Sequence, residues 1–115
     1  MTDKISIKNA EHYNWGKNCD GSHLLNNKNL SVIQEKVPPG KSEVKHFHSI
    51  LHQFFFILEG EGTIEIENKE VILQKNKGLE IPSGIPHKFR NNSKKDVIFL
   101  VITSPKSHGD RIGCE

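Results

Sequence analysis

Short apolar runs broken by turn residues constrain the fold of this 115-residue chain more than any other feature. No window shows the sustained 3.6-residue periodicity of an amphipathic helix. Runs that read as strands lie at residues 30–37, 44–48, 53–58, 63–67, 71–73, 79–81, 87–91 and 97–102. Glycine- and proline-rich turns separate these runs. This pattern predicts an all-β chain folded as a sandwich or a barrel.

The two ends of the chain carry weaker signals. Residues 1–29 are poorly periodic, although residues 4–7 alternate and could form a short edge strand. Residues 104–115 look irregular. We therefore expect one domain over residues 1–115, with an N-terminal strand and loop arm at 1–29, a barrel core at 30–103 and an irregular tail at 104–115.

Composition and charge argue against nucleic-acid binding, membrane insertion and secretion. The formal net charge is only +2, which gives no basis for binding nucleic acid. The sequence contains no apolar run long enough to span a membrane and no apolar segment of a secretion signal near Met1. Cys19 and Cys114 are far apart and form no CxxC pair, so we expect two thiols in a reducing cytoplasm.

Three histidines form the strongest candidate site. His46 and His48 are two residues apart in a predicted strand, so their side chains point to the same face. His87 follows a Pro-Ser-Gly turn much later in the chain. An apolar run at residues 54–58 directly follows the first pair, which indicates that this region lines the core. The alternative is that the histidines bind no metal and only make hydrogen bonds.

The spacing of these residues resembles the two signatures of the cupin superfamily. The first signature is matched by Gly40, His46, His48 and Gly60, with Gln53 in the place of its acid. The second is matched by Pro82, Gly84, His87 and Asn91, while the glycine expected before that proline is displaced to Gly78. The resemblance implies a double-stranded β-helix, or jelly-roll barrel, and a single cupin domain.

The resemblance also implies a metal site with His46, His48, Gln53 and His87 as ligands. Imidazole suits Zn, Fe, Ni, Mn and Cu, so the metal is a divalent transition ion whose identity stays open. Because Gln53 is neutral, the ion would keep its full +2 charge apart from bound anions. We expect weaker metal binding, a more acidic bound water and stronger attraction of anionic substrates. Gln53 could instead orient a bound water.

Other side chains are candidates for the wall of the pocket. Phe55 shares the strand face of Gln53, and Phe89 shares the face of His87, so both should line the cavity. Phe54 and Phe56 should face the other way, toward the second sheet or a partner subunit.

His52 is a candidate rim residue. Trp15, Tyr13 and Cys19 could cap the pocket mouth or simply close one end of a small core. The remaining histidines have no matching partners and are expected to be exposed: His12, His23 and His108.

Three functions stay open. The first is a metal-dependent small-molecule enzyme of the oxygenase, isomerase or lyase type. The second is a binding module that takes up a sugar or metabolite without converting it, and the third is a metal-free structural domain. No GxSxG, GxGxxG or phosphate-loop motif competes with the histidines. By resemblance we also expect a homodimer, with residues 30–37 as an edge strand and Phe54 and Phe56 as contacts.

Overall fold

The computed structural model describes residues 3–16, 18–43, 45–105 and 111–113, the last three by their backbone. Every regular element within these residues is a β-strand, and none is a helix that could cross a membrane. The strands are β1 (Glu11–Trp15), β2 (Cys19–Asn26), β3 (Ser31–Val37), β4 (His46–His48), β5 (His52–Glu59), β6 (Gly62–Ile66), β7 (Lys69–Leu73), β8 (Gly78–Ile81), β9 (His87–Arg90), β10 (Val97–Ser104) and β11 (Arg111–Gly113).

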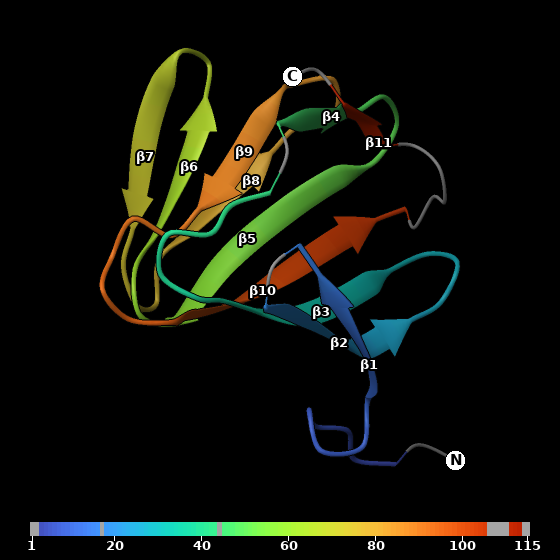
Figure 1. Cartoon of the computed structure of the whole chain (residues 1–115). Coiled ribbons are helices and arrows are strands. Elements are labelled where there is room, and N and C mark those ends of the chain that lie inside the picture. The colour runs from blue at the N-terminus through green and yellow to red at the C-terminus, as the bar shows by residue number, and fades with distance from the viewer. Residues whose placement is uncertain (1–2, 17, 44, 106–110, 114–115) are drawn as a thin grey trace.

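The strands form two antiparallel sheets that face each other (Figure 1). The six-stranded sheet, here sheet A, has the order β1-β2-β3-β10-β5-β8. The five-stranded sheet, here sheet B, has the order β11-β4-β9-β6-β7. Neighbouring strands are often distant in sequence, as expected when a chain winds back and forth between two sheets. The predicted all-β jelly-roll fold is confirmed.

Three aromatic rings join the sheets at the centre of the core. Phe89 of sheet B stacks on Phe99 of sheet A, with ring centroids 4.1 Å apart. Phe55 stacks on both at 5.8 Å. All three side chains are almost fully buried, because alternate residues of each strand point between the sheets. This aromatic cluster fixes how β9 lies over β10 and β5.

The chain also ties the sheets together through Asn91, which directly follows β9. Its buried amide nitrogen donates to the carbonyl of Val37, at the end of β3, at 2.9 Å and to that of Lys95 at 2.7 Å. Its amide oxygen accepts hydrogen bonds from the backbone and hydroxyl of Ser93. Because Asn91 shares the strand face of Phe89 and His87, this anchor also fixes the strand that carries His87.

Several local expectations from the sequence are wrong. Residues 4–7 form no strand, and two strands, β1 and β2, form instead in the stretch from residue 11 to 26. The sequence favours Asn68–Lys69 as the two-residue hairpin turn after β6, but the turn is Glu67–Asn68, one residue earlier. Both residues have positive φ, at 53° and 62°, which is the conformation that a tight hairpin turn requires. Part of the tail expected to be irregular forms β11, which pairs with β4.

Residues 30–37 were expected to form a strand at the edge of a sheet; the strand forms, but its edge position is wrong. This segment is β3, and it pairs with β2 on one side and β10 on the other. Its backbone groups are therefore used within sheet A and cannot pair with another chain.

Candidate metal centre

The two strands that carry the histidines are neighbours in sheet B. His46 and His48 lie on β4, and His87 begins β9, where it pairs directly with His46. All three are buried, with exposed fractions of 3%, 8% and 0%. One ring nitrogen of each lies within 4.8 Å of those of the other two, a group that could hold a metal ion. Such a triangle has a point within about 2.8 Å of every corner, so shifts of at most about 0.7 Å would bring each nitrogen to the ~2.0–2.1 Å of a Zn–N bond.

The loop before β9 orients the His87 ring. Nδ1 of His87 lies 3.0 Å from the carbonyl oxygen of Ile85. Since a carbonyl can only accept, Nδ1 carries the proton and Nε2 keeps its lone pair. The loop is itself attached to β4, because the backbone N–H of Gly84 donates to the His48 carbonyl. This is the arrangement by which proteins present a histidine to a metal.

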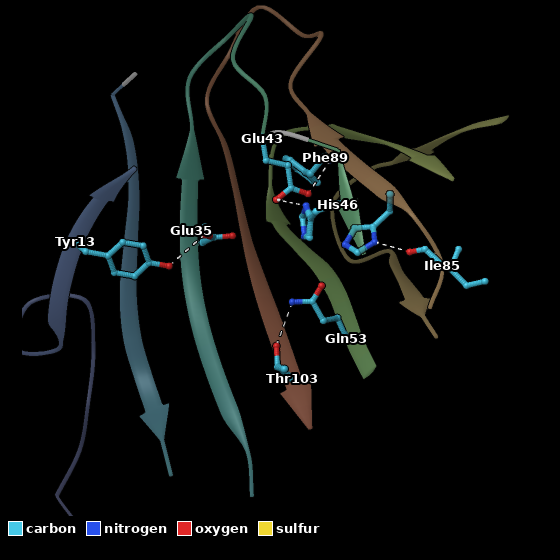
Figure 2. Close-up of polar contacts among 9 residues, drawn as sticks. Tyr13, Glu35, Glu43, His46, Gln53, Ile85, Phe89 and Thr103 are labelled. Atoms are coloured by element: carbon cyan, nitrogen blue, oxygen red, sulfur yellow. Dashed lines mark hydrogen bonds and ion pairs between the residues drawn. The ribbon is translucent and has the colours of Figure 1, made fainter. Parts of the chain in front are cut away.

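Glu43 is a site residue that sequence reasoning missed. One carboxylate oxygen accepts a hydrogen bond from the backbone N–H of Phe89 at 2.9 Å, and the other lies 4.0 Å from Nδ1 of His46 (Figure 2). It therefore places a negative charge behind a candidate ligand. No sequence signal singled it out, since its role depends on β9 lying beside it.

Gln53 lies on β5 of sheet A, across from the histidines. Its Nε2 donates to the Thr103 hydroxyl at 3.3 Å, so the amide nitrogen is used within sheet A (Figure 2). Its Oε1 is buried and has no hydrogen-bond partner in the described part of the chain. The oxygen is the atom through which an amide binds a cation. Thr103, which was not predicted, is the side chain that holds this amide.

The other candidate wall residues lie at different depths. Phe55 is buried with its ring 6.1 Å from that of His87, edge to face, and Phe89 is buried beside it. His52 is exposed at the start of β5. Trp15 is half-buried at the end of β1, where it packs against the core. Phe54 and Phe56 stack on the outer face of β5, and Phe54 is 39% exposed.

The remaining histidines also differ in exposure. His12 is exposed, whereas His23, expected to be exposed, is only partly so, and its ring packs on Tyr13 with centroids 5.1 Å apart. His108 lies outside the described residues. Cys19 is fully buried, and Cys114 also lies outside the described residues.

Tyr13 and Cys19, expected at a pocket mouth or at one end of the core, lie on the inner face of sheet A. The Tyr13 hydroxyl lies 3.4 Å from a carboxylate oxygen of Glu35. Burial, followed by the Glu35 charge and this hydrogen bond, raises the pKa of Tyr13 well above its ordinary value. Burial likewise raises the pKa of the Cys19 thiol. The contact between Tyr13 and Glu35 gave no sequence signal, because only the pairing of β1 to β3 through β2 brings the two residues together.

Comparison with known proteins gives one family. The family model described as "Cupin domain" matches residues 33–103. An oxalate-binding protein of Thermotoga maritima is 30% identical over 70% of this chain and 71% of its own length. An uncharacterised protein of Methanocaldococcus jannaschii is 30% identical over 70% of this chain and 65% of its own. The chain spans only about half the length of two further curated relatives from Streptomyces.

Solved structures agree on the fold. The polyketide cyclase RemF from Streptomyces resistomycificus superimposes with a TM-score of 0.87 at 17% identity, covering all of this chain and 87% of that one. At this identity the similarity concerns the fold alone.

Proposed function

The chain belongs to the cupin family, and on that basis we propose that it is a divalent transition-metal-binding cupin that converts a small molecule. The observation that carries the proposal is the buried group formed by His46, His48 and His87, whose ligand nitrogens lie within 4.8 Å of one another. Three imidazoles that converge in this way suit one divalent transition ion, because imidazole nitrogen is a common ligand of such ions.

The residues present fit such an ion. His46, His48 and His87 would hold it, and Gln53 is positioned by Thr103 to offer its amide oxygen. Three histidines leave coordination positions open, as catalytic sites require. When bound, the metal would supply Lewis-acid polarisation of an oxygen atom or, if redox-active, O2 activation.

The protein's own groups define what the site would accept. Because the nearest candidate ligands are all neutral, the site favours an anionic group on the substrate. Glu43 lies beside Nδ1 of His46, where its negative charge would offset part of the +2 charge of the metal without occupying an open coordination position. Phe55 covers one side of His87 and limits access of water. The reaction class supported is oxygenation, isomerisation or lyase chemistry on a small, anionic molecule.

Metal analysis tests the proposal. We expect about one equivalent of transition metal in the wild-type protein purified without chelator, and its loss in both His46→Ala and His87→Ala. His12→Ala is the matched control, because His12 is exposed on β1 and outside the cluster. Gln53→Glu should raise metal affinity about tenfold or more, since a carboxylate cancels one unit of charge. Equal metal content in all these proteins would refute the proposal.

The alternative is a binding cupin that holds a metabolite without converting it. The similarity to an oxalate-binding protein supports it, as does the neutral Gln53 in place of an acid. A protein that retains metal and binds small anions, but shows neither O2 uptake nor substrate conversion across a metabolite panel, would favour this alternative.

A further inference from the structure

The inner face of sheet A carries a polar group of residues away from the histidines. Cys19 of β2 and Val37 of β3 are fully buried in the core, so residues two apart from them point inward as well. On β2 this rule places Gly21 and His23 inward, and on β3 it places Glu35 inward. On the opposite faces of these strands, Asp20 pairs with exposed Lys36.

Packing and hydrogen-bond contacts hold these inward-facing residues together. The Tyr13 ring from β1 lies over Gly21, and a Cβ atom at that position would overlap the ring. The absence of a side chain lets the Tyr13 hydroxyl reach Glu35 while the ring packs on His23. Gly21 therefore has a packing role that a larger residue could not fill.

Two buried nitrogens in the same region have no hydrogen-bond partner within the described residues. They are Nδ1 of His23 and Nε1 of Trp15, which lies two residues after Tyr13 on the same face of β1. Buried polar atoms are almost always paired, and an unpaired one costs about 1–3 kcal/mol. Their partners therefore come from outside the described residues, as water or a bound molecule would provide.

The polar group and the histidines are close enough to share one ligand. Glu35 is the register partner of Phe99, whose ring stacks on Phe89, two residues from His87. Sheet spacing of ~10 Å, strand spacing of ~4.8 Å and a two-residue offset of ~6.6 Å place the Glu35 and His87 backbones about 13 Å apart. Both residues carry side chains that face the space between the two sheets. Figure 2 shows Glu35 between Tyr13 and the group formed by His46 and Gln53.

We propose that Tyr13, His23 and Glu35, together with Trp15, form a second ligand subsite that binds a hydroxyl group of a small carboxylic acid. This inference rests on the proposed function, because the metal centre would hold the carboxylate of the same molecule. Glu35 supplies an acceptor for the hydroxyl proton, while the ring nitrogens of Trp15 and His23 supply donors for its lone pairs. Tyr13 donates its own proton to Glu35 and so holds that carboxylate in place.

The mixture of donors and an acceptor selects a hydroxyl over other groups. An ammonium can donate to Glu35 but cannot accept from Trp15. A second carboxylate could accept from Trp15 but would be repelled by Glu35. A methyl group would leave all of these polar atoms unpaired.

Matched series of ligands test the subsite on the metal-loaded full chain. The probes are unbranched alkanoates of four to six carbons, the same acids with a terminal hydroxyl, and the same acids with a terminal amine, measured by calorimetry. In the wild type we expect the hydroxy acid to bind about tenfold more tightly than the alkanoate, as one charge-assisted hydrogen bond would give. Glu35→Gln and Tyr13→Phe should each reduce this preference while leaving metal affinity and alkanoate affinity unchanged.

The controls separate this inference from a structural role and from failure of the metal centre. Glu80→Gln, an exposed glutamate on β8, should keep the wild-type preference. A residue that only stabilises β1 would change the unfolding temperature without changing the preference. Absence of metal from the wild type would contradict the proposed function alone. Equal binding of alkanoate and hydroxy acid, tighter binding of the amine, no binding of any probe, or an unchanged preference in both variants would each overturn the subsite.

Discussion

At the scale of single residues, charge is distributed in an unusual way around the three histidines. The position that the family signature gives to an acid carries Gln53, whose amide is neutral. A carboxylate is present nevertheless, from Glu43, but it lies behind His46 and is held by the backbone of Phe89. The candidate ligands are thus neutral, and the negative charge of Glu43 lies on the far side of the His46 ring. This charge lowers the free-energy cost of placing a divalent cation among buried groups.

Tyr13 gives a prediction that one spectrum can check, because it is the only tyrosine in the chain. Burial and Glu35 raise its pKa, so we expect its phenolate absorbance to appear at a pH well above the ordinary value of about 10. Glu35→Gln should lower this pKa only part of the way, because burial is the larger cause and remains. A wild-type titration at the ordinary value would show that Tyr13 is not held as described.

The raised pKa of Tyr13 also makes the stability of the protein depend on pH. A raised pKa in the folded state means that folding favours the protonated phenol. Its contribution is fully present below pH ~10 and is lost as the pH rises from there toward the folded-state pKa. The difference in unfolding free energy between the wild type and Tyr13→Phe should therefore shrink in that alkaline range, and a difference that stays constant would contradict this assignment.

At the scale of elements, β9 depends on the residue that ends it. Asn91 is fully buried, and its amide joins the end of β9 in sheet B to Val37 of β3 in sheet A. Asn91→Ala should lower the unfolding free energy by about 2–4 kcal/mol, because it leaves two backbone carbonyls without their donor. Denaturant unfolding measures this change.

The adjacent asparagine is the control for this prediction. Asn92 is exposed, so Asn92→Ala should change the unfolding free energy by no more than about 0.5 kcal/mol. Similar values for the two variants would mean that Asn91 does not tie the sheets together. Because His87 lies on the strand that Asn91 anchors, Asn91→Ala should also weaken metal binding in a folded protein.

At the scale of the whole molecule, the outer face of sheet A remains partly apolar. Phe54 and Phe56 stack there with ring centroids 6.3 Å apart, and neither packs into the core between the sheets. Since β3 is an interior strand, the expected pairing of two chains through that strand is not available. A homodimer would have to form through this face, or through one of the strands at the ends of the sheets.

We predict that the wild-type chain sediments as a dimer at micromolar concentration and that Phe54→Asp sediments as a monomer, because a charge would oppose burial of this face. Ile72→Asp, on exposed β7 of sheet B, is the control and should remain dimeric. A monomeric wild type would refute the dimer, and a dimeric Phe54→Asp would place the interface elsewhere.

Local sequence patterns were enough to predict the fold class, most of the strands and the group of three histidines. Strand alternation, turn residues and the spacing of two signatures are local properties, and they sufficed to place His46, His48 and His87 on inward faces. The grouping of Glu43 behind His46, Thr103 beside Gln53, and Tyr13 next to Glu35 was decided only by the tertiary structure. Each of these pairs joins different strands or a strand and a connecting segment, and side-chain contacts of that kind depend on register and sheet order, which no local pattern records.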